Sequence, residues 1–399
     1  MTSPVLCVIG TRPEAVKLAP VISELRRRDV DHLVLSTGQH RELVDAILNG
    51  FGLESDIDLE IMTAEQSPTA VAARVLERLE PVLQTLHPST VLVQGDTTTV
   101  MATGIAAAYA QVSVAHLEAG LRTGDRSQPF PEEHNRVLAT AVADLHFAPT
   151  WRARNNLLRE GVSESKIVVT GNTVIDALLW ARDLVAGQPK PTPLESLNPD
   201  KALILMTAHR RESHGARLEE TFSAVRQLVT ERDDTAVLYP VHPSPAVREP
   251  ARRLLGDLDD VALCDPLGYR DLVSVLDSSK LVLTDSGGIQ EEAPAFGKPV
   301  LVLRDTTERP EAVESGVARL VGTSAASILN AVNELLDNPT AYAKMAVGDS
   351  PYGDGLAAGR VVAALQGEPL SEFSAGDRQA LKVAGDEATV LASLPAPAG

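Results

Sequence analysis

The sequence predicts an α/β protein made of two units, each with a mostly parallel β-sheet. Short apolar runs rich in β-forming residues alternate with segments of helical period, which is the pattern of parallel strands joined by helical crossovers. That rhythm breaks once, near 186–201, and then resumes. The 399 residues also exceed one small core, at about 150 residues per domain.

Each expected strand precedes a plausible helix. In the first half the strands are expected at Val5–Ile9, Leu33–Ser36, Val91–Val93, Val112–Ala115, Leu145–Ala148 and Ile167–Val169. In the second half they are expected at Ala202–Met206, Ala236–Tyr239, Val261–Leu263, Leu281–Leu283 and Val300–Leu303. The halves share no fixed-period motif, so we expect their similarity to be architectural.

The proline-rich stretch at 187–193 reads as a stiff, exposed connection between the units. Near the end, 354–365 carries apolar residues on one helical face, and the chain after Leu370 turns rich in Ala, Ser, Gly and Pro. We therefore expect an N-terminal domain over 1–185, a C-terminal domain over 201–353, a final helix within 354–370 that returns to the first domain, and a partly disordered tail over 371–399.

Charge and cysteine content narrow the class of protein. The net charge of −18 should repel nucleic acid and anionic membrane surfaces, so an anionic ligand would need a locally basic site. Cys7 and Cys264 lie in apolar runs and form no CxxC motif, which argues against a disulfide framework. We find no leader pattern and no apolar run near the roughly 18 residues that cross a bilayer. A cytoplasmic protein without nucleic-acid or membrane partners is expected.

Polar and ionisable residues follow most of the expected strands. Ligands of doubly wound sheets bind beyond the carboxyl ends of the strands, so these residues predict a shared cleft, although any one of them alone is usually a turn cap. They are Gly10–Arg12, Thr37–His40, Gln94–Asp96 and His116–Glu118 in the first unit, and Thr207–Arg211, Val241–Pro243, Asp285–Gly288 and Arg304–Asp305 in the second.

The glycine-rich turn within Thr284–Glu292 is the sharpest local signal. Backbone N–H groups of Ser286, Gly287 and Gly288 at the start of a helix can bind phosphate. Glu292, four residues after Gly288, lies on the same helix face and can accept from ribose hydroxyls. A serine cap with tight packing is the alternative. No GxGxxG or GxxxxGK[ST] motif occurs, which argues against dehydrogenases and P-loop NTPases.

Arg12 follows the first strand and precedes a helix that is expected to begin at Pro13. A guanidinium at this place can hold a diphosphate with two hydrogen bonds. The alternative is a surface pair with Glu14. Lys17, one turn further on, either adds positive charge or is simply solvated.

Carboxylates gather in the first unit at Asp96, Glu118 and Glu132–Glu133. Near an anionic ligand they cost free energy unless they transfer protons or stabilise positive charge, so they indicate acid–base chemistry on a neutral, sugar-like group. Structural alternatives are that Asp96 caps the helix that follows it and that Glu132 pairs with Arg136.

Histidines also follow several strands, at His40, His116, His209 and His242. Neither HExxH nor paired CxxC spacing is present, so no metal is expected. These side chains either donate hydrogen bonds to phosphate or substrate, or have a structural role.

Together the motifs resemble those of one known family, the non-hydrolysing UDP-N-acetylglucosamine 2-epimerases. The resemblance spans roughly residues 5–365 in order. The motifs that carry it are Gly10–Lys17 (GTRPEAVK), Thr37–Arg41 (TGQHR), Gly95–Thr99 (GDTTT), His116–Thr123 (HLEAGLRT), Pro131–Arg136 (PEEHNR), Thr170–Asp176 (TGNTVID), His209–Ser213 (HRRES), Asp285–Glu292 (DSGGIQEE) and Arg304–Glu311 (RDTTERPE).

The resemblance implies a glycosyltransferase-B-like fold, with two Rossmann-like doubly wound domains and the active site in the cleft between them. It implies an isomerase that interconverts UDP-N-acetylglucosamine and UDP-N-acetylmannosamine without NAD or metal, usually as a homodimer, for cell-envelope polysaccharides. UDP is eliminated to leave 2-acetamidoglucal and is added back with the opposite configuration at C2.

The resemblance also implies roles for single residues. The catalytic residues would be Asp96, Glu118, Glu132 and His209, and which carboxylate removes the C2 proton stays open. The UDP-sugar would be bound by Arg12, Lys17, Leu267, Leu272, Ser286, Gly287, Gly288, Glu292 and Arg309. Bacterial members bind a second UDP-N-acetylglucosamine as an activator, in segments that here hold Gln39, His40, Arg41, Gln66, Arg210 and His242.

Three positions depart from the family pattern. Leu272 stands where a phenylalanine commonly faces uracil, Leu267 replaces a common glutamine, and Glu65 replaces a frequent glycine near the activator segment. Two other functions stay open. One is a hydrolysing 2-epimerase that releases UDP and N-acetylmannosamine, and the other is a non-catalytic regulator that binds nucleotide sugars, which would not need the carboxylates.

Overall fold

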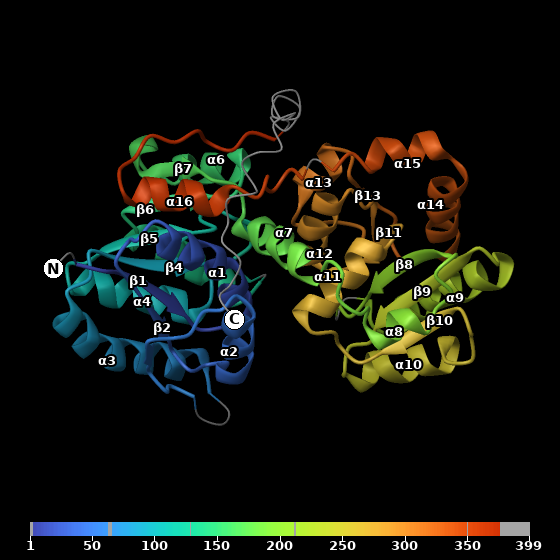
Figure 1. The fold of residues 1–399 in the computed structure, drawn as a ribbon, viewed down its shortest axis with the longest axis horizontal. Coiled ribbons are helices and arrows are strands. Elements are labelled where there is room, and N and C mark those ends of the chain that lie inside the picture. The colour runs from blue at the N-terminus through green and yellow to red at the C-terminus, as the bar shows by residue number, and fades with distance from the viewer. Residues whose placement is uncertain (1–2, 63–65, 128, 211–212, 349, 376–399) are drawn as a thin grey trace.

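The computed structural model describes residues 3–62, 66–127, 129–210, 213–348 and 350–375. Most of the predicted tail, 376–399, lies outside these residues, as does Glu65. The described chain forms two α/β lobes side by side, which confirms the predicted fold class (Figure 1). No described helix is long and apolar enough to span a bilayer.

The first sheet is wholly parallel, and among the described residues its strands follow the order β3-β2-β1-β4-β5-β6-β7. The order reverses beside β1, which is where a doubly wound sheet opens a binding crevice. The strands are β1 (Val5–Ile9), β2 (His32–Ser36), β3 (Ile57–Asp58), β4 (Thr90–Gln94), β5 (Ser113–Leu117), β6 (Leu145–Ala148) and β7 (Ile167–Val169).

The second sheet repeats this plan, with the strand order β10-β9-β8-β11-β12-β13 and parallel pairing throughout. Its reversal lies between β8 and β11. The strands are β8 (Ala202–Thr207), β9 (Thr235–Pro240), β10 (Val261–Cys264), β11 (Leu281–Thr284), β12 (Val300–Val302) and β13 (Ala318–Leu320).

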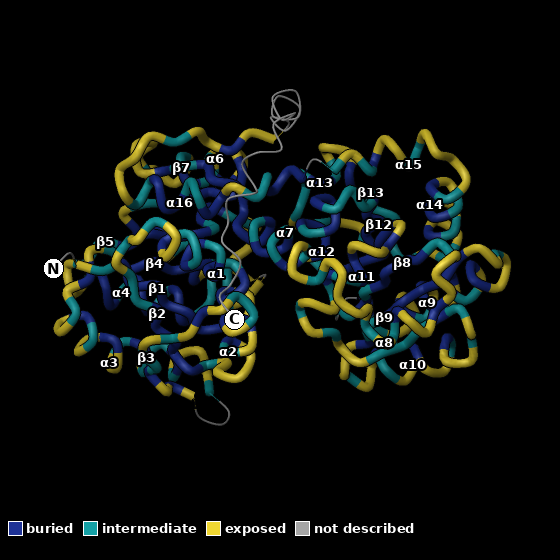
Figure 2. The backbone as a smooth tube through the Cα atoms, viewed as in Figure 1, coloured by how far each residue is buried: buried dark blue, intermediate teal, exposed yellow. Residues whose placement is uncertain are grey.

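Helices cover the faces of both sheets, so the central strands β1 and β11 are fully buried, and all of their residues except Thr284 are apolar (Figure 2). The first lobe holds α1 (Arg12–Arg27), α2 (Arg41–Gly50), α3 (Pro68–Leu86), α4 (Thr98–Tyr109), α5 (Glu132–Val142), α6 (Trp151–Arg159) and α7 (Thr173–Val185). Next come α8 (Thr192–Glu195), α9 (Ala216–Glu231), α10 (Pro245–Leu255), α11 (Tyr269–Ser278), α12 (Gly287–Glu292), α13 (Pro310–Glu314), α14 (Ala325–Asp337) and α15 (Pro339–Met345).

Two segments connect the lobes. Helix α7 packs against α1 of the first lobe and against α11 of the second, and the chain then enters the second sheet (Figure 1). After α15 the chain returns, and α16 (Ala357–Leu365) packs on α1 and α7. The carboxylate of Asp176 on α7 caps α16 by accepting from the N–H groups of Ala357 and Ala358. We retain 1–185 and 201–353 as the proposed domain limits.

Candidate functional site

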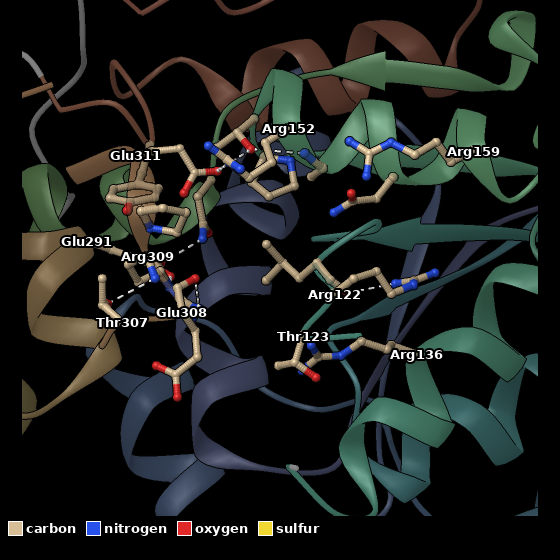
Figure 3. Close-up of a pocket in the computed structure, with 18 residues that line it drawn as sticks. Arg122, Thr123, Arg136, Arg152, Arg159, Glu291, Thr307, Glu308, Arg309 and Glu311 are labelled. Carbon is tan, nitrogen blue, oxygen red and sulfur yellow. Dashed lines mark hydrogen bonds and ion pairs between the residues drawn. The ribbon is translucent and has the colours of Figure 1, made fainter. Parts of the chain in front are cut away.

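A cavity of about 310 Å³ lies between the lobes, beyond the carboxyl ends of the strands. The first lobe lines it with residues that follow β5, β6 and β7, and the second with residues of α12 and the loop after β12. In Figure 3, Arg122, Arg136 and Arg152 project from the first lobe, and Glu291 and Arg309 from the second. Arginines of the first lobe therefore meet both a carboxylate and an arginine of the second lobe in one cleft.

A chain of polar contacts crosses this cleft. Lys17 Nζ lies 2.6 Å from both carboxylate oxygens of Glu118. The amide of Asn172 donates to Glu118 at 3.2 Å and to Glu291 of the other lobe at 2.9 Å. Glu291 also accepts from Arg309 Nε. Asn172 thus joins the two ion pairs.

Electrostatics keep the Lys17–Glu118 pair charged. Burial opposes ionisation of Glu118, but the positive charges of Lys17 and Arg309 outweigh it and lower the pKa of that carboxyl. Burial likewise disfavours the ammonium form of Lys17, but Glu118 and Glu291 raise its pKa overall. Glu118 is therefore an anion at neutral pH.

Asp96, at the end of β4, pairs with Arg136 of α5. Arg136 also bonds to Glu133 at 3.0 Å, and Glu133 accepts from the backbone N–H groups of Thr123 and Gly124. Both structural alternatives are wrong, because Thr97 rather than Asp96 caps α4 and because Arg136 is not paired with Glu132. Glu132 is half-buried, and its side chain makes no hydrogen bond or ion pair with the described residues.

The second lobe contributes the turn after β11. Ser286 is the N-cap of α12, and its side chain makes no capping hydrogen bond. A methyl group at Gly287 would lie 3.8 Å from an Nη2 atom of both Arg210 and Arg309, so two guanidinium groups flank this helix start. Burial, with the negative charge of Glu291, raises the pKa of Glu292 to about 7. The turn combines backbone donors, two cations and a carboxyl group.

His209 follows β8 and lies beside this turn. The buried carboxylate of Asp285 accepts from the backbone N–H groups of His209 and Arg210, both at 2.7 Å. The rings of His209 and His242 stack with centroids 5.5 Å apart. Burial lowers the pKa of His209 despite the nearby Asp285 charge, so its ring is neutral at neutral pH.

Comparison with known proteins decides the family. The profile of the UDP-N-acetylglucosamine 2-epimerase family matches residues 23–366. An Escherichia coli K12 UDP-N-acetylglucosamine 2-epimerase is 48% identical over 373 residues, which cover 92% of this chain and 99% of that protein. A Bacillus subtilis relative of the same name is 48% identical over 363 residues, covering 90% and 94%.

A solved structure agrees. The crystal structure of the Neisseria meningitidis UDP-GlcNAc 2-epimerase bound to UDP-GlcNAc superposes on this chain with a TM-score of 0.82. The two sequences are 42% identical, and the match covers 92% of this chain and 100% of the other. The chain belongs to the UDP-N-acetylglucosamine 2-epimerase family. Its two parallel-sheet lobes are the glycosyltransferase-B-like fold of these epimerases.

Arg12 lies at the start of α1 and is exposed. The alternative surface pair with Glu14 is wrong, because Glu14 is buried and bonds to Gly10 and Thr11. Leu267 and Leu272 are half-buried and pack against the large apolar core around α11. Their predicted contact with uracil stays a prediction.

The residues predicted to bind an activator lie in two separate parts of the structure. Gln39, His40 and Arg41 line a second cavity of about 570 Å³, where Arg41 faces Asp58 and Glu60 at 3.3 and 3.6 Å. Gln66 donates to the carbonyl of Ile61 instead. Arg210 flanks Gly287, and His242 stacks on His209, so these two lie by the turn after β11.

Asn172 and Glu291 were not predicted as site residues, and Asp285 was expected only as one of the residues that follow the strands. Each lies inside a motif that carries the family resemblance, which was the available signal. Their roles come from contacts between elements far apart in the chain, and spacing within one motif does not reveal such contacts. Among the described residues, no group of three or more His, Cys, Asp or Glu side chains is placed to hold a metal ion.

Proposed function

We propose that this protein interconverts UDP-N-acetylglucosamine and UDP-N-acetylmannosamine by inverting C2 of the sugar. The observation that carries the proposal is the meeting of two kinds of group in one cleft. Asp96 and Glu118 of the first lobe bond to two residues that line this cleft, Arg136 and Asn172, and the cation Arg309 of the second lobe lines it as well. The Neisseria meningitidis relative, solved with UDP-GlcNAc bound, supports the substrate.

The second lobe would hold UDP. The N–H groups at Ser286–Gly288, with Arg210 and Arg309, stabilise the negative charge that grows on the diphosphate as the C1–O bond breaks. Arg12 approaches from the first lobe, and Glu292 accepts from the ribose hydroxyls. Leu267 and Leu272 contact the base.

The first lobe would carry the proton transfer. One carboxylate removes the C2 proton, the electron pair forms the C1–C2 double bond, and UDP leaves with the C1 oxygen, giving 2-acetamidoglucal. UDP then adds back to C1 while an acid protonates C2 from the opposite face. Elimination and addition are redox-neutral, so the balance requires no oxidant.

The surroundings divide these roles among the carboxylates. Glu118 is held ionised by Lys17, so we assign it to stabilise positive charge on the ring. Asp96 and Glu132 supply the base and the acid, and His209, with a neutral ring, binds the diphosphate or its oxygen at C1. The sugar is enclosed between the lobes, away from water.

Proton NMR of the purified protein with UDP-N-acetylglucosamine in D₂O, without NAD or metal, tests this function. The expected product is UDP-N-acetylmannosamine with deuterium at C2. Free N-acetylmannosamine with UDP would show the hydrolysing reaction instead. Binding of UDP-N-acetylglucosamine with no exchange at C2 would show a regulator. A parallel sample with EDTA should turn over at the same rate.

The homodimer, the activator function of the Gln39–Arg41 cavity, the cytoplasmic location and the role in cell-envelope polysaccharides stay predictions. Light scattering at micromolar concentration would measure whether the protein is a dimer. Curves of rate against UDP-N-acetylglucosamine concentration would reveal the activator function, because activation by the substrate makes them sigmoidal.

A further inference from the structure

The carboxylate of Asp285 lies where the strand order of the second sheet reverses. Asp285 directly follows β11, and His209 comes two residues after the end of β8. The backbone N–H of Asp285 donates to the carbonyl of Thr207 at 3.0 Å, which extends the pairing of these two strands. Only 1% of the surface of Asp285 is exposed. Because a binding crevice opens at such a reversal, this buried carboxylate lies next to the loops that would hold a ligand.

The two oxygens of the Asp285 carboxylate face different groups. Oδ2 accepts from the backbone N–H groups of His209 and Arg210. Oδ1 is buried and has no hydrogen-bond partner among the described residues. The ring atom His209 Nδ1 lies 3.5 Å from it, which is within ion-pair range but long for a hydrogen bond. Buried acceptors rarely stay without a partner, so Oδ1 is placed to serve this ring.

The surroundings of His209 fix its backbone and one face of its ring. The Tyr239 hydroxyl donates to the carbonyl of Ala208 at 2.5 Å, next to the two N–H groups that Asp285 holds. The ring stacks on His242, whose Nδ1 accepts from a backbone N–H at 3.1 Å, as only a neutral ring can. Nδ1 of His209 faces a buried atom, yet 39% of its side chain is exposed. Its other nitrogen, Nε2, is therefore left to face the cleft.

Charge decides what this ring presents to a ligand. A carboxylate beside Nδ1 favours the tautomer with the proton on Nδ1, which leaves a lone pair on Nε2. Diphosphate oxygens are acceptors too, so a neutral ring in this tautomer cannot donate to them through Nε2. Burial lowers the pKa of His209 despite the charge of Asp285, and positive charge on His242, Arg210 and His214 acts in the same direction as burial. A bound diphosphate acts in the opposite direction.

We propose that Asp285 is a positioning residue that holds the His209 ring with a proton on Nδ1, so that the ring takes up a second proton when the diphosphate of a nucleotide binds. This proton comes from solvent and adds to the lone pair of Nε2. The resulting imidazolium donates one N–H to Asp285 and the other to the diphosphate. Hydrogen bonds of this kind often tighten only once the ligand is bound.

The inference deepens the proposed function, on which it rests. The oxygen that leaves C1 of the sugar belongs to the diphosphate, and it gains negative charge as the C1–O bond breaks. A charged donor at Nε2 stabilises that charge more than a neutral donor does. Asp285 would thus act on the leaving group through His209 without touching the substrate itself.

Calorimetric titration of the full chain with UDP, in buffers of different ionisation enthalpy, counts the protons taken up per UDP bound. UDP is almost fully ionised at pH 7.5, because the second pKa of a terminal phosphate is about 6. We expect the wild type to take up more than about half a proton and its Kd for UDP to weaken roughly tenfold between pH 7.5 and 9. Uptake near zero would overturn the proposal.

His209→Gln identifies the group that takes up the proton. We expect this variant to take up almost no proton and its Kd for UDP to vary less than about threefold over the same pH range. Uptake equal to that of the wild type would place the proton on another group, such as Glu292, and would reject the proposal.

Asp285→Asn tests the positioning role. The amide keeps the size of the side chain and one acceptor oxygen, but its NH₂ group favours the opposite tautomer, with the proton on Nε2. Proton uptake should vanish, and kcat should fall about tenfold or more. The ¹⁵N shifts of the ring, assigned by the signal that His209→Gln lacks, should change from an Nδ1–H to an Nε2–H pattern. Unchanged shifts together with unchanged uptake would contradict the inference.

Asp176→Asn is the matched control. Asp176 is also a carboxylate that accepts from two backbone N–H groups, but these belong to Ala357 and Ala358 at the start of α16. This variant should have a lower melting temperature, while its proton uptake and its Kd for UDP stay within about twofold of the wild type. The same result for Asp285→Asn would show a purely structural role and overturn the inference.

The experiment also separates this inference from the proposed function. If the wild type epimerises UDP-N-acetylglucosamine but takes up no proton with UDP, the function stands and the inference fails. If it takes up the proton but turns over no UDP-N-acetylglucosamine, the function fails and the inference about the UDP site stands. If Asp285→Asn does not fold, the ring shifts of the wild type decide, and an Nε2–H pattern there rejects the inference.

Discussion

Carboxyl groups around the cleft differ in their partners, and this difference determines what each can do. Glu118 is bound to a lysine and Asp96 to an arginine, so both are held in place by cations. The side chains of Glu132 and Glu292 make no hydrogen bond or ion pair with described residues. Distinct surroundings of this kind are how one site divides acid, base and binding roles among similar groups.

At Asp96, replacement by asparagine should separate chemistry from binding. Asp96→Asn keeps the size of the side chain but removes a proton acceptor, and general acid–base catalysis contributes about 10²–10⁴-fold. We expect kcat to fall by at least about a hundredfold while the Kd for UDP stays within a few-fold. Turnover followed by NMR measures kcat, and calorimetric titration measures the Kd for UDP. Asp260→Asn, which loses only the pair with Lys201, is the control. Full activity of Asp96→Asn would refute the assignment.

The Glu292 carboxyl should lower the stability of the protein as pH rises from 4.5 to about 7. Its pKa rises from 4.5 to about 7 on folding, so the folded protein disfavours the ionised form and loses stability as pH rises through this window. At about 1.4 kcal/mol per pKa unit the loss approaches roughly 3 kcal/mol above pH 7. Glu292→Gln should therefore be more stable than wild type at pH 8 and no different in this respect below pH 4.5.

Urea unfolding at pH 4.5, 6 and 8 measures this effect. Exposed Glu220→Gln should follow the wild type at every pH. Equal unfolding free energies for Glu292→Gln and wild type at pH 8 would contradict the prediction. The same variant should bind UDP more weakly, because the neutral amide offers the ribose hydroxyls one acceptor oxygen where the carboxylate offers two.

Single residues were predictable from sequence only where their role is local. The Gly287–Gly288 turn and Arg12 at the start of a helix could be read from neighbouring residues. The pairing of Arg136 with Asp96, 40 positions away, and the inward turn of Glu14 could not, because both depend on packing between elements.

Among the strands, too, some were predicted from the sequence and others were not. The expected strands from Val5–Ile9 to Val300–Leu303 are all present, and Leu145–Ala148 and Ile167–Val169 have the observed bounds. The short strands β3, of two residues, and β13, of three, were not predicted. β3 is too short to form a readable apolar run, and the run of β13 is interrupted by Arg319, whereas the equally short β7 is wholly apolar.

The turn after β5 contains a glycine that packs tightly against helix α6. Gly120 has φ of +88°, and a methyl group there would lie 2.3 Å from the carbonyl oxygen of Ala153 in α6. Gly120→Ala should destabilise the protein by about 2–4 kcal/mol, because both strain and a backbone clash arise. Denaturant unfolding checks this value. Gly124→Ala, also at positive φ but with open space around it, should cost less. Equal losses would mean that the contact with α6 contributes nothing.

At the scale of the whole molecule, the polar chain from Lys17 to Arg309 joins the lobes through Asn172 and Glu291. Further contacts lie beside it, where Thr150 and Arg152 of the first lobe bond to Glu311 and Glu314 of the second. A ligand that binds groups on both sides of the cleft would strengthen this contact, and domain closure of this kind excludes water.

UDP should therefore compact the protein. Its diphosphate would bridge Arg12 of the first lobe and Arg309 of the second, so we expect the radius of gyration from small-angle scattering to fall measurably on saturation with UDP. Uridine lacks the diphosphate and is the matched control, which should leave the scattering curve unchanged. An identical curve with and without saturating UDP would exclude closure.

The return of the chain through α16 constrains such motion. The second lobe is attached at two places, through α7 and through the segment that leads back to α16. A body fixed at one point can tilt and spin in any direction, whereas a body fixed at two can only rotate about the line between them. If UDP closes the lobes as predicted, these two attachments would favour opening and closing about one line, and each closure would bring the same arginines and carboxylates back into register.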